Sequence, residues 1–253
     1  MGDAMHRLLL LLLCLLGWVA PVSAFAQEAP PQEPMLRIEA GMHTAVIRRI
    51  DTDAAGRFVV TASLDKTVRV WDAATGDLLR VLRPPIGEGD EGKVYATAIS
   101  PDGRLVAAGG WTELGSDSGH TIYLFDRAGG RLLRRLTGLS NVIHDLAFSP
   151  DGRHLAAGLG GSNGIRVWRA GGDWPLVRSD TDYGDQVYGL SWAADGRLAT
   201  TSYDGAVRLY GPDLQLRWRV TAPGGKQPFG IAFAPDGRRL AVGHDDGRVS
   251  VVP

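Results

Sequence analysis

The sequence is poor in cysteine and has no excess of charge of either sign. Its single cysteine, Cys14, lies in an N-terminal segment that we expect to be removed from the mature protein. The mature chain would then have no disulfide, no thiol nucleophile and no cysteine metal ligand. The 27 Lys and Arg residues nearly balance the 28 Asp and Glu residues, which gives a formal net charge of -1. This balance gives no electrostatic attraction to nucleic acid or to an anionic membrane surface, and we expect neither as a partner.

Long hydrophobic runs are also lacking. The longest, Leu8 to Val19, has 12 residues and is too short to span a bilayer. His6 and Arg7 precede it, and the small-x-small pattern Ala24-Phe25-Ala26 follows it, as in a secretory signal peptide. We therefore predict a signal peptide over residues 1–26 and a periplasmic or secreted protein.

Two further expectations concern this terminus. Cleavage is expected after Ala26 or after Ala24, and a buried helix or a short anchor is the alternative reading of the apolar run. A lipid anchor is not expected, because Leu13 stands where a lipoprotein signal needs a small residue before Cys14. Residues 27–34 contain three prolines and predict an extended linker.

The signatures of common enzyme classes are absent as well. The sequence contains no G-x-S-x-G and no H-E-x-x-H motif, and no strand position repeatedly carries a carboxylate. We therefore predict a non-catalytic protein without a metal site and without a cofactor.

Glycine, by contrast, is abundant and regularly placed. The dipeptide Gly-Arg recurs at steps of 47, 49, 44 and 41 residues, at Gly56, Gly103, Gly152, Gly196 and Gly237. Around the first copy, two β-type runs at residues 58–61 and 68–71 enclose a polar turn and predict a hairpin that ends in Trp71-Asp72. A period of about 40–45 residues with a Trp-Asp signature is typical of a propeller blade.

Each repeat predicts four strands, which we name a to d in chain order. Strand b follows Gly-Arg, and strand a precedes it, at residues 45–50, 94–99, 143–148, 187–192 and 228–233. From the second repeat on, a turn ending in Asp-Gly joins strands a and b. The last repeat has no strand d, but MLRIE at residues 35–39 is similar to the d strand LLRVL at residues 78–82. We predict that this N-terminal strand completes the last blade and closes the ring.

These repeats resemble the WD-repeat β-propeller family, in an exported form of bacterial type, over residues 35–253. The resemblance implies an all-β fold of five blades, each with four antiparallel strands, in a ring closed by the N-terminal strand. The expected blades span about 43–91, 92–140, 141–184, 185–227, and 228–253 together with 35–39. The resemblance also implies a hydrogen-bonded network in the first blade, formed by His43, Ser63, Asp65 and Trp71. Later repeats depart from this pattern, and we expect them to be held together by packing.

The second position of strand a lies at the mouth of the central channel in the family, on the face that usually takes partners. Here it is occupied by Val46, Tyr95, His144, Tyr188 and Phe229. Exposed aromatic residues are typical anchors of an interface. We therefore predict that Tyr95, His144, Tyr188 and Phe229 bind a protein or peptide, with Trp111 at the rim. If these rings only pack between blades, the site is expected in the polar loop from Trp111 to His120 instead.

Most residues expected to line the channel are small, but Arg49 and Asp145 are charged. One reading is that the two residues pair with each other or reach solvent. The other is that they place charge in the channel. A glycine-rich turn at residues 158–164 predicts a flexible turn, with an anion-binding nest as the alternative. The preferred function is an exported scaffold that binds a protein or peptide. The alternatives are a lactonase- or glycosidase-like hydrolase acting at the channel mouth, and the N-terminal propeller of a longer multidomain protein.

Overall fold

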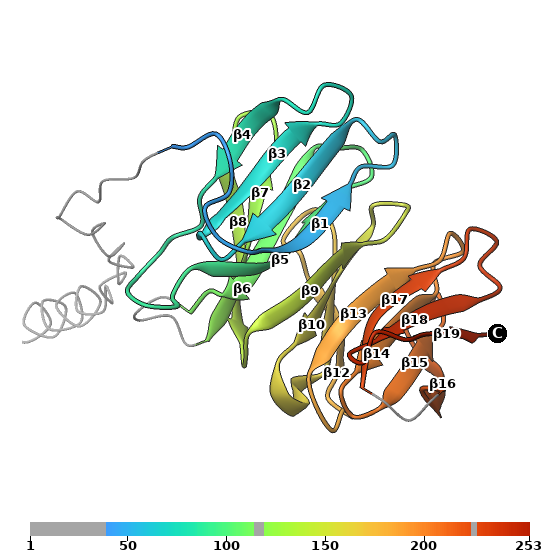
Figure 1. Ribbon diagram of the computed structural model, residues 1–253. Coiled ribbons are helices and arrows are strands. Elements are labelled where there is room, and N and C mark those ends of the chain that lie inside the picture. Colours follow the sequence, from blue (N-terminus) through green and yellow to red (C-terminus); the bar gives the residue numbers. More distant parts are fainter. Residues whose placement is uncertain (1–38, 114–118, 224–226) are drawn as a thin grey trace, which may run out of the picture. The chain divides into compact units, whose positions relative to one another are not determined.

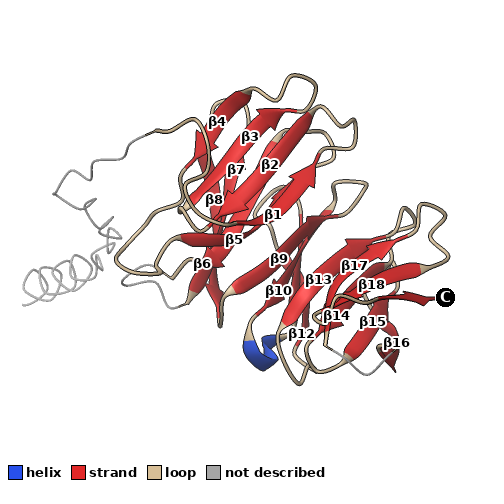
Figure 2. Ribbon diagram, in the orientation of Figure 1, coloured by secondary structure: helices blue, strands red, loops and turns tan. Residues whose placement is uncertain are grey.

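The computed structural model describes residues 39–113, 119–223 and 227–253, which are almost entirely β-strands and turns (Figure 1). The predicted signal peptide, the linker and residues 35–38 of the predicted closing strand lie outside the described residues. The blades belong to the compact unit Ala40–Pro253. The described residues contain one short 3-10 helix, η1 (Gly161–Asn163), which Figure 2 shows beside the strands of the third blade. No helix in this part of the chain has the length and apolar character needed to cross a membrane.

The described strands form five antiparallel sheets, one for each repeat. The first sheet consists of β1 (Ile47–Thr52), β2 (Phe58–Ser63), β3 (Thr67–Asp72) and β4 (Leu78–Leu82). The second consists of β5 (Lys93–Ile99), β6 (Leu105–Trp111), β7 (His120–Asp126) and β8 (Leu132–Leu139). The third consists of β9 (Ile143–Phe148), β10 (His154–Leu159), β11 (Ile165–Arg169) and β12 (Leu176–Asp180).

The last two sheets follow the same order. The fourth consists of β13 (Val187–Trp192), β14 (Leu198–Ser202), β15 (Ala206–Tyr210) and β16 (Leu216–Thr221). The fifth has three strands in the described residues, β17 (Pro228–Phe233), β18 (Leu240–His244) and β19 (Val249–Val252). Consecutive strands are neighbours in every sheet, so each repeat of the sequence forms one blade.

In the second to fifth blades, an Asp-Gly pair builds the turn between the first two strands. In the second blade, the Asp102 carboxylate accepts a hydrogen bond from the Arg104 N–H at 3.0 Å. Gly103 has φ of 72°, a conformation that glycine adopts without steric cost, and its N–H donates to the Ser100 carbonyl at 2.8 Å. The hydrogen-bonded turn fixes where each first strand ends and each second strand begins.

Neighbouring blades are held together by hydrophobic clusters. Val60 and Val70 of the first blade pack with Val94 and Val106 of the second, and all four are fully buried. Similar clusters join the second blade to the third, the third to the fourth and the fourth to the fifth. Burial of apolar area on this scale is the main stabilising term of the fold. It also places the first strands of consecutive blades beside one another.

The predicted fold class is confirmed: the molecule is an all-β propeller of five antiparallel blades. Ring closure by residues 35–39 stays a prediction, because residues 35–38 lie outside the described residues. In the described part of the chain, β1 and β17 do not pack side by side as the other neighbouring inner strands do. Val249 of β19 is 71% exposed, and Ile50 of β1 is 64% exposed.

Candidate functional site

A β-bulge recurs near the start of the first strand of every blade. In each case the pairing with the second strand skips one residue, as at Tyr95, which lies between the paired residues Val94 and Ala96. The five residues left unpaired in this way are Arg48, Tyr95, His144, Tyr188 and Phe229. A bulge re-aims the side chain of the extra residue. The propeller therefore presents one large side chain per blade from equivalent positions.

The rings at these positions form a continuous row. The centroids of Tyr95 and His144 lie 6.2 Å apart with nearly parallel planes, and those of His144 and Tyr188 lie 4.5 Å apart. Tyr188 and Phe229 follow at 4.6 Å, again stacked. The structure thus brings together all four rings that the sequence predicted at the channel mouth.

The first blade requires a correction. The sequence placed Val46 at the equivalent position, but the bulged residue is Arg48. The first strand begins and ends two residues later than predicted, because residues up to Thr52 still pair with the second strand. Arg48 is exposed and its guanidinium carbon lies 5.5 Å from the centre of the Tyr95 ring. Sequence reasoning also missed Tyr203, which lies 4.5 Å from Tyr188 in the turn between β14 and β15.

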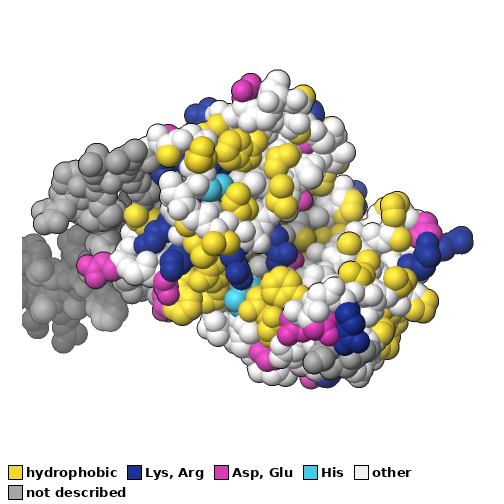
Figure 3. Space-filling model, viewed as in Figure 1, with side chains coloured by type: hydrophobic (Ala, Val, Ile, Leu, Met, Phe, Trp, Pro, Cys, Tyr) yellow, Lys and Arg dark blue, Asp and Glu magenta, His cyan; other side chains and the backbone are white. Residues whose placement is uncertain are grey.

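These residues surround a pocket of about 370 Å³, which we call the mouth pocket. It is lined by Arg48, Leu64, Tyr95, Trp111, Asn141, Val142, His144, Gly160, Gly161, Gln186 and Tyr188. Trp111, at the end of β6, is 41% exposed and lines this pocket. Figure 3 shows a histidine among hydrophobic side chains, with Lys or Arg side chains close by, near the centre of the view.

Burial controls the ionisation of His144. It lowers the pKa of His144 to about 4, and a hydrogen bond with Gln186 offsets this only in part. The nearby Arg48 and Arg49 guanidinium groups lower that pKa further. His144 is therefore neutral at pH 7, and the charge of the mouth pocket resides on Arg48.

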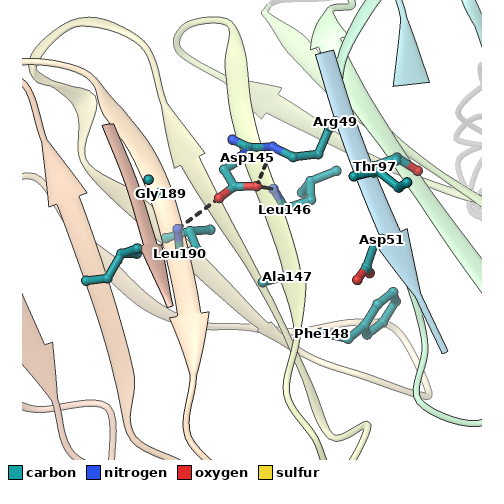
Figure 4. Close-up of a pocket in the computed structure, with 12 residues that line it drawn as sticks. Arg49, Asp51, Thr97, Asp145, Leu146, Ala147, Phe148, Gly189 and Leu190 are labelled. Carbon is teal, nitrogen blue, oxygen red and sulfur yellow. Dashed lines mark hydrogen bonds and ion pairs between the residues drawn. The ribbon is translucent and has the colours of Figure 1, made fainter. Parts of the chain in front are cut away.

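The channel beneath the mouth contains the two charged residues that the sequence singled out. Arg49 Nε lies 3.1 Å from Asp145 Oδ1, so the two residues pair with each other (Figure 4). The Arg49 guanidinium also donates to the carbonyl oxygens of His144 and Tyr188, at 3.1 and 2.8 Å. Burial raises the pKa of Asp145 to about 6, although Arg49 and the N–H groups of Leu190 and Leu146 lower it in part.

This pair lines a cavity of about 260 Å³ to which all five inner strands contribute. The small residues Ala147, Gly189 and Gly230 line it, as expected, whereas Ala96 and Ala98 are buried in the core between the second and third blades. Because every polar atom of the Asp145 carboxylate has a partner, the pair acts as a structural tie between the first, third and fourth blades.

The hydrogen-bonded network of the first blade forms, but Thr61 rather than Ser63 accepts the hydrogen bond from Trp71. His43 Nδ1 lies 2.8 Å from Asp65 Oδ2, and its Nε2 lies 2.7 Å from Thr61 Oγ1. The Trp71 indole N–H donates to Thr61 Oγ1 at 2.8 Å. The predicted member Ser63 does not bond to Trp71: its hydroxyl donates to the Ala45 carbonyl and accepts a hydrogen bond from the Asp65 N–H. Trp71 pairs with Val59, and Thr61 is the next residue on the same face of that strand. Ser63 lies two residues further along the strand.

The fourth blade has its own polar network, which contradicts the expectation that packing alone holds the later blades. Arg208 is 1% exposed and binds the Asp204 carboxylate with both terminal nitrogens, at 2.6 and 3.2 Å. It also lies over the Tyr183 ring, 3.8 Å from its centre. Burial would raise the pKa of Asp204, but hydrogen bonds from Arg208, Gly184 and Ala206 lower it to about 2. Tyr183 takes the place that His43 has in the first blade, because each lies five residues before the bulged residue of its blade and contacts a threonine hydroxyl of the second strand, at 2.9 Å for Tyr183 and Thr200.

The loops near the mouth are only partly described. Residues 114–118 of the predicted alternative site lie outside the described residues. At its described end, His120 accepts a hydrogen bond from the Thr112 N–H, and its ring meets Trp111 edge-on at 5.8 Å. In the glycine-rich segment, the Gly160 N–H donates to the Val142 carbonyl.

The family model described as "WD domain, G-beta repeat" matches the chain five times, at residues 40–72, 77–126, 130–169, 175–211 and 221–252. The chain is 32% identical over 176 residues to the small ribosomal subunit protein RACK1y of Oryza sativa subsp. japonica, a match that covers 66% of this chain and 45% of that protein. It is 30% identical over 199 residues to the WD repeat-containing protein SL1-17 of Schistosoma mansoni, covering 77% of this chain and 61% of that protein.

A third relative is a guanine nucleotide-binding protein subunit beta of Arabidopsis thaliana. The chain is 37% identical to it over 117 residues, which cover 44% of this chain and 29% of that protein. The matches therefore span less than two thirds of the length of each of these curated relatives.

Proposed function

Because the chain belongs to the WD-repeat β-propeller family, we propose that it is an exported, non-catalytic scaffold that binds a protein or peptide at the mouth pocket. Tyr95, His144, Tyr188 and Phe229 are the contact residues of this surface, with Trp111 at its rim. The observation that carries the proposal is the bulge that every first strand makes at the same register. Inter-blade packing alone does not require a large side chain to turn toward the channel mouth at each of these positions.

The names of two relatives support a role in assembly. RACK1y is a protein of the small ribosomal subunit, and the Arabidopsis relative is a subunit of a guanine nucleotide-binding protein. Each is thus one component of a larger assembly. The formal net charge of -1 favours a protein or peptide partner over nucleic acid for this chain.

Export and a bacterial-type origin are proposed from the N-terminal sequence. The positive start at His6 and Arg7, the apolar run from Leu8 to Val19 and the pattern Ala24-Phe25-Ala26 together have the organisation of a cleaved signal peptide. N-terminal sequencing of protein recovered from the periplasm or the culture medium should begin at Gln27 or Phe25. Recovery of an uncleaved chain in the cytosol would contradict export.

Substitution of the row of rings tests the binding surface. Tyr95→Ala and Tyr188→Ala should each weaken capture of a partner from periplasmic extract by at least about 1–2 kcal/mol, the loss typical of an interface anchor. The melting temperature should change little, because both residues are partly exposed. Leu176→Ala is the matched control, since Leu176 is 51% exposed on the outer strand of the third blade.

The alternative result is equally informative. If both tyrosine variants melt earlier than the wild type but bind normally when folded, the rings belong to the core and the surface lies elsewhere. If Leu176→Ala weakens capture as much as Tyr188→Ala does, the captured protein does not recognise the mouth pocket.

A further inference from the structure

The first blade differs from the others at its bulged position. Four blades present a ring there, whereas the first presents the cation Arg48. Within the described residues, Arg48 lies over the Tyr95 ring but has neither an ion pair nor a hydrogen bond. The adjacent Arg49 pairs with Asp145 and donates to two backbone carbonyls. Arg48 is thus the cation that the mouth pocket offers to a ligand.

The lining of the mouth pocket contains hydrogen-bond donors but no opposing charge. None of the described residues that line it is an aspartate or a glutamate. Asn141 and Gln186 contribute side-chain amides, and the tyrosines Tyr95 and Tyr188 contribute hydroxyl groups. His144 is neutral at pH 7, as shown above. A carboxylate entering this pocket would meet one full positive charge and several neutral donors.

The stacked rings leave the charge of the pocket to Arg48. Tyr95 stacks on His144 with an angle of 4° between the planes, and Tyr188 stacks on Phe229 with an angle of 21°. Ring faces carry the negative part of the aromatic quadrupole and ring edges the positive part. A carboxylate would therefore approach Arg48 and the ring edges rather than a ring face.

Acidic residues lie next to the mouth pocket, on the far side of Trp111. Glu88, Asp90, Glu91 and Glu113 surround a second hollow that includes Trp111, and Asp90 pairs with Lys93. A run of negative charges that extended from Arg48 past Trp111 would be repelled by this rim. A single carboxylate with neutral neighbours would avoid this rim and meet Arg48 among the residues that line the pocket.

We propose that Arg48 determines the specificity of the mouth pocket by binding the side-chain carboxylate of one aspartate or glutamate in a protein partner. The proposal rests on the proposed function, since it names the chemistry of the partner at the same surface. Arg can hold a carboxylate through two parallel N–H···O bonds. A phosphorylated residue fits less well, because phosphate sites are typically formed by a cluster of arginines, and Arg49 is already paired with Asp145.

A charge-swap selection tests this assignment. A phage library of random 12-residue peptides is selected on the wild-type protein and on Arg48→Gln, Arg48→Glu and Arg104→Gln. Arg104 is the matched control, because it is an exposed arginine in the turn between β5 and β6, at the opposite end of the blade from Tyr95. The wild type and Arg104→Gln should enrich one acidic position within a shared consensus. Arg48→Gln should lose that preference, and Arg48→Glu should replace it with Lys or Arg.

Binding of one synthetic consensus peptide then measures the contact. By calorimetry, the peptide should bind Arg48→Gln at least tenfold more weakly than it binds the wild type. Replacing its acidic residue by Gln or Asn should cause the same loss with the wild type and no further loss with Arg48→Gln. A consensus without an acidic position, or one that Arg48→Gln retains, would overturn the role of Arg48.

Further outcomes separate this inference from the proposed function. If a consensus without an acidic position is abolished by Tyr188→Ala, the mouth pocket binds peptides and only the role of Arg48 is wrong. If the wild type selects nothing, or if selection survives Tyr95→Ala together with Tyr188→Ala, the proposed function is wrong as well. A phosphoserine peptide that binds at least tenfold more tightly than its acidic counterpart would overturn the carboxylate in favour of a phosphate.

Discussion

At the scale of single residues, Trp71 offers a test of the network in the first blade. Its indole N–H donates to Thr61, whose hydroxyl also contacts His43. Trp71→Phe keeps most of the apolar volume but removes this donor, so we expect the free energy of unfolding to fall by about 1–3 kcal/mol. Urea denaturation measures the change, and peptide binding should stay the same because these residues do not line the mouth pocket.

Trp168 provides the matched control for this substitution. It occupies the equivalent place in the third blade and is 6% exposed, but its indole N–H has no hydrogen-bond partner among the described residues. Trp168→Phe should therefore cost only the difference in packing. Equal losses in the two variants would show that the hydrogen bond to Thr61 contributes nothing to stability.

The position of Arg48 was available in the sequence, although the strand boundaries concealed it. Each bulged residue lies eight residues before the glycine that opens the second strand, as Tyr95 lies before Gly103 and Arg48 before Gly56. The prediction instead counted from the expected start of the strand and reached Val46. It ended the strand at Ile50 and so took the turn of the first blade to be longer than the others. Residues 53–57 form a turn as long as residues 100–104 of the second blade, and the Asp53 carboxylate accepts hydrogen bonds there from the N–H groups of Arg57 and Phe58. Counting back from the glycine of the turn is more reliable than counting from the expected start of a strand, because strand ends depend on backbone pairing.

At the scale of strands, the pair of Arg49 and Asp145 links β1 to β9 and β13 and makes stability depend on pH. The pKa of Asp145 is about 6 in the folded protein, above its ordinary value of 3.8. The folded state therefore binds the proton more tightly than the unfolded state does, and this group favours folding most below pH 4. As the pH rises through 6 the contribution is lost. We expect the stability of the wild type relative to Asp145→Asn to fall by about 2–3 kcal/mol between pH 4 and pH 7.

Comparison with Asp145→Asn isolates this titration, because all other carboxylates are shared by the two proteins. Thermal unfolding at pH 4, 5, 6 and 7 gives the difference at each pH. Asp51 and His144, the nearest other titrating groups, are present in both variants. A difference that grows with rising pH would mean that Arg49 holds Asp145 ionised and that the ion pair outweighs burial.

The arrangement of the strands was largely predictable, whereas the polar contacts inside the blades were not. Three of the inner strands, β9, β13 and β17, have the predicted bounds, because Gly-Arg and the Asp-Gly turns fix their ends. The network of the fourth blade was missed, because Tyr183 stands where the first blade has His43, and because its charged member, Arg208, lies within a strand. A buried arginine in a strand sequence such as VRLY cannot be told from an exposed one by alternation alone. The burial of Arg208 depends on its contacts with Asp204 and Tyr183, which form only in the folded blade.

At the scale of the whole propeller, the first and last blades differ from the other three in their exposure. Val249 and Val251 of β19 are 71% and 59% exposed, and Ile47 and Ile50 of β1 are 51% and 64% exposed. In addition, β19 pairs only with β18 in the described residues, so one edge of the last sheet has no strand beside it there. Exposed apolar edges of this kind promote association between molecules. The similarity of residues 35–39 to the outer strand β4 provides a candidate to cover that edge.

Deletion of this segment tests closure of the propeller. If residues 35–39 form the outer strand of the fifth blade, removing residues 27–40 from the mature protein should lower the free energy of unfolding by about 3–5 kcal/mol, a loss as large as that of a severe core lesion. The shortened protein should also associate, as light scattering would reveal, because the edge of β19 would then be free to pair with another chain. Removing only residues 27–34 is the matched control and should change neither property, since a proline-rich linker buries little apolar area. If the longer deletion leaves a monomer with an unchanged melting temperature, the prediction of closure by this strand is wrong, and the exposed valines of β19 must be covered by another part of the protein or by a partner.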